Sequence, residues 1–287
     1  MNLLGKLVTY SMVIDILGDS NLSLPLYNLA PTLFPFFRHA IPNVHLAVPP
    51  LIVLVNPNPP FNTTVLLDNF YGRQFSSLND IKVLPGTDIL FFTDPTYGWL
   101  FDFRLELMIP SQVYRFDPST GPVQVVADQF VHPNGIAFTP DGRMTDTGAA
   151  NGLMPNNQTL PATIYQYDVD PVTQSFTNRR VFAYSDTGIP DGIQLDMNGN
   201  VYSGCGDGTH VWNSQSTLIG KFFINSTSAE MIFTKSGLLI LAEELVYLVN
   251  VQAHGIDLEG WFHERLQRTE SPGTWILAYL HHDIVCI

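Results

Sequence analysis

A nine-residue motif recurs along the chain and constrains the fold more than any other feature of the sequence. Three copies, NGIAFTPDG, DGIQLDMNG and AEMIFTKSG, begin at Asn134, Asp191 and Ala229 and share apolar third and fifth residues and a ninth glycine. A looser copy, NDIKVLPGTD, begins at Asn79. Alternating apolar residues that end in a glycine turn predict a short strand followed by a hairpin. The chain therefore reads as a series of repeated β units.

Each copy is followed by two or three further candidate strands, so the repeated unit is a small sheet. The copies that begin at 79, 134 and 191 are 55 and 57 residues apart, and the last follows after 38. Four short strands in a unit of ~40–50 residues are typical of a β-propeller, in which neighbouring blades bury each other's faces. A β-sandwich is the main alternative, but it does not explain near-identical first strands at regular spacing. About four blades are predicted between residues 52 and 252.

The two ends of the chain lack this pattern. We predict a propeller domain over residues 51–252, flanked by poorly patterned segments at 1–50 and 253–287. The stretch from residue 53 to residue 70 resembles the outer two strands of a preceding blade. The first blade is therefore expected to be incomplete or degraded.

Charge and composition exclude several classes of function. A formal net charge of −13 argues against a nucleic-acid partner, which requires a basic face. No run of about 20 apolar residues is free of charge, so no membrane span is predicted. The two cysteines, Cys205 and Cys286, lack the spacing of a metal site or a disulfide framework. Location stays open between cytoplasm and secretion, because the signal peptide is unconvincing while four N-x-S/T sequons begin at the asparagines 21, 62, 157 and 225.

The first position of the repeat carries the candidate site. In a propeller the first strand of each blade lines the central channel, so equivalent positions face one another at one mouth. Asn79, Asn134 and Asp191 place three oxygen-bearing side chains there, and hard oxygen ligands suit a divalent cation. Asn and Asp before Gly are also ordinary turn residues, so the structural explanation remains open beside the functional one.

Five other polar residues lie close to the motifs and are weaker candidates. His132 and His210 flank two of the copies, where packing or a place at the rim is the more ordinary role. Asp94, Tyr97 and Asp146 are positioned to line the channel or to stabilise turns. Neither a nucleophile elbow nor a phosphate-binding loop is present.

Several motifs together resemble one known family. SSLNDIKV, FFTDPTYGW, HPNGIAFTPDG and IPDGIQLD, within residues 52–250, are similar to the SMP-30/gluconolactonase family, and most to its fungal lactonohydrolase-like branch. The resemblance implies an all-β, six-bladed β-propeller. It also implies one divalent metal ion in the channel, usually calcium, with zinc, magnesium or manganese as alternatives. The implied activity is hydrolysis of sugar-type lactones or related esters, with a small-molecule lactone as substrate; the oligomeric state is left open.

The resemblance also implies roles for individual residues. Asn134 matches a metal ligand, and Asp191 matches a residue that binds the metal and acts as the catalytic general base. Asn79 matches a residue that contacts the substrate or a metal-bound water. The family's remaining ligand is a glutamate on the first blade, whereas this chain has no Glu before Glu106. Two hypotheses follow: a metal-dependent lactone hydrolase, or a catalytically impaired or truncated propeller that serves as a binding scaffold.

Overall fold

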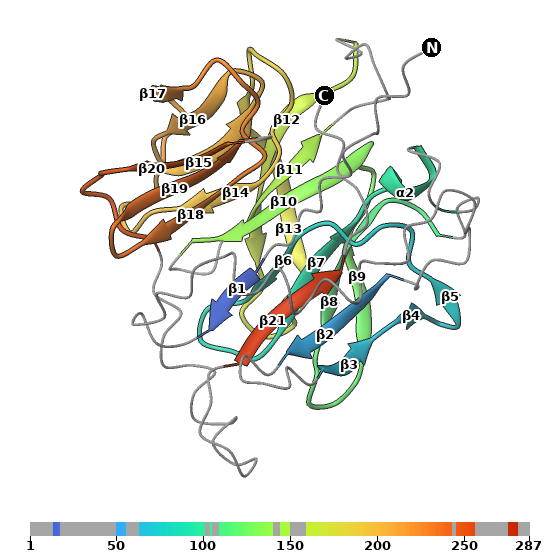
Figure 1. The fold of residues 1–287 in the computed structure, drawn as a ribbon. Coiled ribbons are helices and arrows are strands. Elements are labelled where there is room, and N and C mark those ends of the chain that lie inside the picture. The colour runs from blue at the N-terminus through green and yellow to red at the C-terminus, as the bar shows by residue number, and fades with distance from the viewer. Residues whose placement is uncertain are drawn as a thin grey trace, which may run out of the picture.

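Strands dominate the part of the chain that the structure describes. The structure is a computed structural model that describes residues 14–17, 50–55, 63–100, 104, 109–139, 144–149, 159–242, 245–255 and 275–280, with the backbone alone for 14–17, 55, 144–149 and 275–280. Within these residues there are five antiparallel sheets of three or four strands and one two-stranded hairpin. A short helix, α2 (Tyr97–Leu100), follows β7 (Figure 1).

Three four-stranded sheets follow one another along the chain, each in simple sequential order. The first contains β6 (Ile81–Val83), β7 (Leu90–Asp94), β8 (Gln112–Phe116) and β9 (Val123–Ala127). The second contains β10 (His132–Phe138), β11 (Met144–Ala149), β12 (Ala162–Val169) and β13 (Phe176–Tyr184). The third contains β14 (Ile193–Leu195), β15 (Val201–Cys205), β16 (Gly208–Trp212) and β17 (Leu218–Phe223). The first strand of each sheet overlaps a copy of the repeated motif.

The other two sheets bracket these three. A three-stranded sheet contains β18 (Glu230–Thr234), β19 (Gly237–Ala242) and β20 (Leu245–Val249). A four-stranded sheet has the order β1-β21-β2-β3, from β1 (Ile14–Leu17), β21 (Trp275–Leu280), β2 (Leu51–Val55) and β3 (Thr63–Leu67). The hairpin consists of β4 (Asn69–Phe70) and β5 (Arg73–Gln74).

Strands from opposite ends of the chain share one sheet. Ala278 of β21 pairs with Ile14 of β1 on one side and with Val53 of β2 on the other. Figure 1 shows the red β21 between the blue β1 and β2. Both β1 and β21 therefore contribute to the fold although neither end showed a blade pattern. The domain boundaries at residues 50 and 252 stay a prediction.

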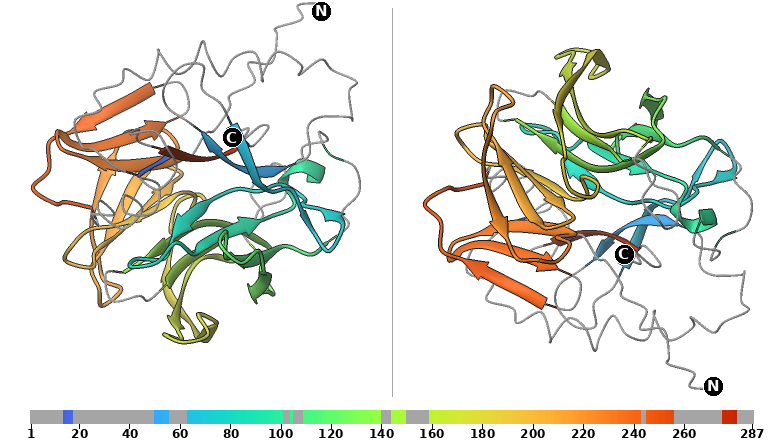
Figure 2. Two further views of the ribbon diagram at one scale, coloured as in Figure 1. Left: turned by 90° about the horizontal axis from the view of Figure 1, so that it is seen from below. Right: turned by 90° about the horizontal axis from the view of Figure 1, so that it is seen from above.

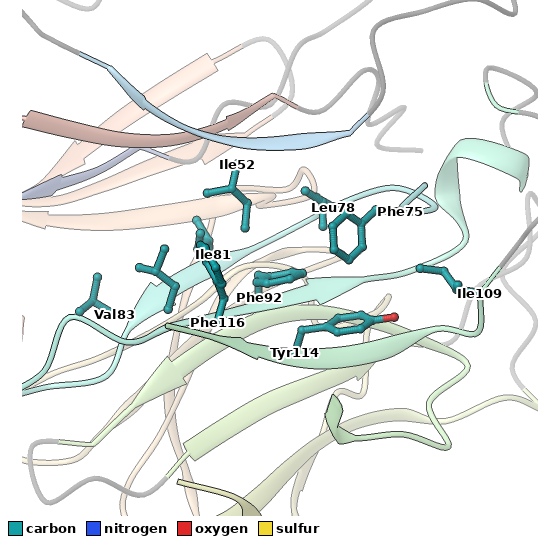
Figure 3. Close-up of a cluster of buried hydrophobic side chains, with 10 residues drawn as sticks. Ile52, Phe75, Leu78, Ile81, Val83, Phe92, Ile109, Tyr114 and Phe116 are labelled. Carbon is teal, nitrogen blue, oxygen red and sulfur yellow. The ribbon is translucent and has the colours of Figure 1, made fainter. Parts of the chain in front are cut away.

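The apolar third and fifth positions of the repeat form the core between sheets. Ile81 and Val83 of β6 pack in one cluster with Ile52 of β2 and with Phe75 and Phe92. Figure 3 shows Ile52 reaching from its own strand toward this group. Full burial of an aliphatic side chain contributes about 1.5–3 kcal/mol, so the sheet formed by both chain ends is held to its neighbour by apolar packing.

The remaining junctions repeat this arrangement. Ile136 and Phe138 pack against Phe91 of the preceding sheet. Ile193 and Leu195 lie in a cluster shared with the β10–β13 sheet, and Met231 packs with residues of the β14–β17 sheet. The sheets therefore succeed one another like blades around a common centre (Figure 2). The prediction of an all-β fold of the propeller type is confirmed, and the described residues supply five of its sheets.

The ninth position of the repeat explains its glycine. Gly199 and Gly237 have φ angles of 76° and 133° in the turns that follow the first strands of their sheets. A side chain at such angles would be strained. Glycine therefore fixes the hairpin that sends each second strand back along the first.

Candidate functional site

The predicted site residues of the first two motif copies are joined through one buried threonine. The backbone N–H of Asn79 donates to Thr93 O at 3.0 Å, and Thr93 Oγ1 donates to the backbone carbonyl of Asn134 at 2.8 Å. Thr93 lies in β7 and is fully buried. The starts of β6 and β10 are therefore held at a fixed separation across the junction of two sheets.

The third predicted residue is placed beside the second by a glycine. A Cβ added to Gly135 would lie 2.6 Å from Asp191 O and 2.8 Å from Ile193 N. The backbones that start β10 and β14 therefore approach more closely than any other residue type would allow. The N–H of Asp191 donates to Gly204 O at 2.9 Å, which fixes it to its own sheet. The structure thus brings the chain at Asn79, Asn134 and Asp191 to one end of three neighbouring first strands.

The side chains at these positions differ in burial and in bonding. Asn79 and Asn134 are 3% and 7% exposed, whereas Asp191 is partly exposed. Asn134 Nδ2 donates to Tyr97 Oη at 3.0 Å. Within the described part of the chain, no group donates a hydrogen bond to Asn134 Oδ1 or pairs with the Asn79 amide. The site therefore contains two buried amide side chains and one partly exposed carboxylate.

The second position of the repeat holds charged residues that the sequence analysis missed. This position is Asp80 in β6's copy and Glu230 in β18's copy, with glycine in the two between. Asp80 Oδ1 accepts the N–H of Ile81 at 2.7 Å, and Oδ2 accepts that of Ile136 at 2.8 Å in the next sheet. The ammonium of buried Lys82 lies 3.5 Å from Asp80 Oδ1. Asp80 thereby links two sheets through its side chain.

Glu230 reaches toward the same region from the three-stranded sheet. Its Oε1 accepts the N–H of Met231 at 2.8 Å, and a Cβ added to Gly192 would lie 2.5 Å from its Oε2. Burial, reinforced by the negative charge of Asp80, raises the pKa of Glu230 to about 8. The Lys82 charge opposes this shift, and the charge of Asp191 adds to it. The Glu230 carboxyl is therefore held largely protonated near neutral pH.

A column-by-column comparison of the repeat would have found both acids. The second column contains Asp80, Gly135, Gly192 and Glu230. The two acids are in the first and last copies. Of the glycines between them, Gly135 leaves space for the backbone at Asp191, and Gly192 leaves space for the Glu230 carboxyl. The first position of the repeat is the more conspicuous one in the sequence, because three of its four residues carry an amide or a carboxylate.

Two weaker candidates, Asp94 and His132, form hydrogen bonds beside the site. Asp94 accepts the N–H groups of Ser76 and Ser77 at 2.9 and 2.6 Å, and burial raises its pKa to about 7 against those bonds. His132 Nδ1 is 2.8 Å from Thr96 Oγ1. These contacts fasten the segments before β6 and after β7.

The other two candidates and the cysteine occupy different places. His210 is buried in β16, and its Nε2 lies 2.5 Å from Asp207 Oδ1. Asp146 is opposite Ile136 in the β10–β11 ladder. Cys205 is buried in β15, and burial raises its thiol pKa to about 12. Cys286 lies outside the described residues.

The described residues contain neither a cluster of metal-binding side chains nor a helix that could cross a membrane. Among them, no three or more His, Cys, Asp or Glu side chains lie together in a way that could hold a metal ion. A cation at the site would therefore depend on amide oxygens as well as carboxylates. No described helix has the length and apolar character to cross a membrane. Asn225 of the fourth sequon is exposed, and the other three sequon asparagines lie outside the described residues.

The fold and this group of polar residues define the class of protein, a β-propeller whose neighbouring blades carry polar residues where their first strands begin. The family model of the SMP-30/gluconolactonase/LRE-like region matches residues 50–223. The chain therefore belongs to that family, as the sequence motifs indicated.

Relatives of known name are consistent with this membership. The chain is 32% identical over 186 residues to lactonohydrolase oryL of Aspergillus oryzae, covering 60% of this chain and 42% of that protein. It is 27% identical to a gluconolactonase of Zymomonas mobilis, covering 55% of this chain and 44% of that protein. This chain thus spans less than half the length of these curated relatives.

Solved structures show the same fold. A gluconolactonase of Xanthomonas campestris superposes with a TM-score of 0.58 at 22% identity, over 78% of this chain and 64% of that one. A luciferin-regenerating enzyme superposes with a TM-score of 0.52 at 15% identity, over 80% of this chain and 71% of that one. These likenesses establish the propeller architecture.

Proposed function

We propose that this chain is a metal-dependent hydrolase that opens sugar-type lactones. The observation that carries the proposal is the convergence of Asn79, Asn134 and Asp191 at one end of three adjacent first strands, through Thr93 and Gly135. The names of the relatives, lactonohydrolase and gluconolactonase, support the choice of a lactone as substrate.

The residues present fit a hard divalent cation, calcium above all. Asn134 Oδ1 and the Asp191 carboxylate are the proposed ligands, and the Asn79 amide is left for the substrate. All of these donors are oxygens, which calcium prefers, and both asparagine residues are buried. Such a cation, when bound, polarises a carbonyl and lowers the pKa of water.

Asp191 is the proposed general base. Its carboxylate would accept a proton from water as the water oxygen bonds to the lactone carbonyl carbon. The ring C–O bond then breaks, and the proton passes to the departing oxygen to give a hydroxy acid. Partial exposure of Asp191 leaves it accessible to solvent, as a base for water must be. Asn79 would orient the lactone by hydrogen bonding through its amide.

The test is hydrolysis of an aldonolactone followed by titration of the acid produced. We expect turnover with calcium, loss of turnover with chelator, and a fall of about 10²–10⁴-fold in Asp191→Ala. Asp128→Asn removes one negative charge from an exposed surface position and is the matched control. Turnover that persists in Asp191→Ala, or that ignores chelator, would refute the proposed mechanism.

Two observations favour the alternative of a non-catalytic binding scaffold. No cluster of three or more His, Cys, Asp or Glu side chains in the described residues could hold a metal ion, and no Glu precedes Glu106 in the sequence. Under this alternative the protein would bind a lactone without hydrolysing it. Equilibrium binding of the lactone with no acid released would establish the scaffold over the enzyme.

A further inference from the structure

Two adjacent residues fasten the helix α2 to the start of β10. Thr96 Oγ1 lies 2.8 Å from His132 Nδ1, and Tyr97 Oη accepts a hydrogen bond from Asn134 Nδ2 at 3.0 Å. All four side chains belong to buried residues. Both bonds join the segment at α2 to β10. The first holds the imidazole ring of His132, and the second holds the amide of Asn134, the candidate ligand.

The amide of Asn134 has two ends of opposite character. Its oxygen accepts hydrogen bonds and binds cations, whereas its NH₂ group only donates. Rotation by half a turn exchanges the two and would present N–H hydrogens to a cation or to a donor on the substrate. In the structure the NH₂ end bonds to Tyr97 Oη, so the oxygen end faces the other way.

The tyrosine that supplies this acceptor is itself held in place. Tyr97 is 8% exposed, and its ring centroid is 5.5 Å from that of His132. It lies in α2, three residues after Asp94, whose carboxylate binds the N–H groups of Ser76 and Ser77. The phenol oxygen is thus positioned before any ligand arrives.

We propose that Tyr97 is a positioning residue for the site, because its phenol oxygen holds the Asn134 amide with Oδ1 presented as the ligand atom. This inference rests on the proposed function, in which Asn134 is a ligand. Groups that orient a ligand in this way typically change affinity by about 10–100-fold when removed. Tyr97 acts through Asn134 and has no chemical step of its own.

The test compares Tyr97→Phe with Thr96→Val. The first removes one oxygen and keeps the ring, and the second removes the neighbouring hydrogen bond of the same segment. The probe is calcium chloride, titrated into the full chain by calorimetry. We expect Tyr97→Phe to weaken calcium binding about tenfold or more, and Thr96→Val to leave it within about twofold of the original chain.

A second readout needs no metal. In protein labelled with ¹⁵N at asparagine, the side-chain NH₂ of Asn134 is followed by its hydrogen exchange with water. We expect exchange to accelerate in Tyr97→Phe, which loses the acceptor, and to stay unchanged in Thr96→Val. A general loosening of α2 would instead accelerate exchange in both variants and overturn the inference.

Asn134→Asp supplies an independent check, because a carboxylate has two equivalent oxygens and needs no such orientation. Tyr97→Phe should therefore weaken calcium binding less in the Asn134→Asp background than in the original chain.

Equal calcium affinity of the original chain and Tyr97→Phe would overturn the positioning role and leave the proposed function standing. If the original chain binds no calcium, the metal site of the proposed function fails. The amide exchange then decides alone, since unchanged exchange overturns the inference and accelerated exchange supports it.

Discussion

The starts of β6 and β18 carry an acid at the same position of the repeat and use it differently. Asp80 and Glu230 each accept the N–H of the residue that follows, at 2.7 and 2.8 Å. Asp80 additionally accepts the Ile136 N–H of the next sheet and lies beside the Lys82 ammonium. Glu230 instead packs its carboxyl against Gly192. Equal position in a repeat therefore does not imply equal role.

The difference follows from the partners available to each acid. The Asp80 carboxylate is satisfied by two N–H groups and a cation, so the charged form is stable although the residue is 2% exposed. Glu230 has one N–H group and faces the negative charges of Asp80 and Asp191. Removing one partner from a paired buried charge destabilises a fold strongly, whereas a buried carboxyl with few partners holds a proton instead.

Removing Asp80 is expected to have the largest effect of the changes proposed here. Asp80→Ala takes away the acceptor for the N–H groups of Ile81 and Ile136 and the carboxylate beside Lys82. Loss of one partner from a buried ion pair costs about 3–5 kcal/mol. Urea unfolding followed by circular dichroism would measure it. Asp128→Ala, an exposed control, should change the free energy of unfolding little, and an equally small change in Asp80→Ala would remove the contrast with Glu230.

The sequence predicted the architecture and the alignment of the first repeat position across neighbouring strands, because both depend on local periodicity. Apolar residues at the third and fifth positions of the motif bury themselves between sheets wherever the motif occurs, as Ile81, Ile136 and Ile193 do. The register of these positions then aligns Asn79 and Asn134 without further information. Patterns of this kind are visible in a single sequence.

Contacts between residues far apart in the chain could not be predicted in the same way. The pairing of β1 with β21 joins strands more than 250 residues apart, and the bond between Tyr97 and Asn134 spans 37 residues. Neither contact produces a repeating pattern in the sequence. Glu230 was missed for another reason: its neighbours in the second column, Gly135 and Gly192, have no side chain that marks the position as polar.

The two glycines at the second position of the repeat, Gly135 and Gly192, allow a second comparison. Replacing them is expected to have an effect on stability of intermediate size. A Cβ on Gly135 would meet the backbone of Asp191 and Ile193, whereas a Cβ on Gly192 would meet the end of the Glu230 side chain. A backbone cannot yield as a side chain can, so Gly135→Ala should destabilise by about 1–3 kcal/mol, and Gly192→Ala by less.

Thermal unfolding of the two variants measures the difference. Gly220→Ala is the control, because nothing lies within 4 Å of a Cβ added there. A smaller loss in Gly135→Ala than in Gly192→Ala would contradict the close approach of β10 and β14.

The smallest effect concerns the pH dependence contributed by Glu230. Its folded pKa of about 8 exceeds the ordinary value of 4.5, so the folded state holds the proton more tightly than the unfolded chain. The stability that this supplies is complete below pH 4.5 and is lost as pH rises toward 8. The groups facing the carboxyl are Asp80 and Lys82 beside β6 and Asp191 before β14.

Glu230→Gln should therefore flatten the decline in unfolding free energy between pH 5 and pH 8. One titrating group can change the free energy of unfolding by at most about 1.4 kcal/mol per pH unit. Because Glu230 is partly exposed, solvent screens its charge. We therefore expect a change of roughly 1 kcal/mol over the whole range. The measurement is urea unfolding in chelator at several pH values, with Asp128→Asn as the control that removes an exposed charge. Parallel pH curves for the original chain and Glu230→Gln would show that this carboxyl is ionised in the fold, and Asp80 and Glu230 would then be alike in charge as well as in position.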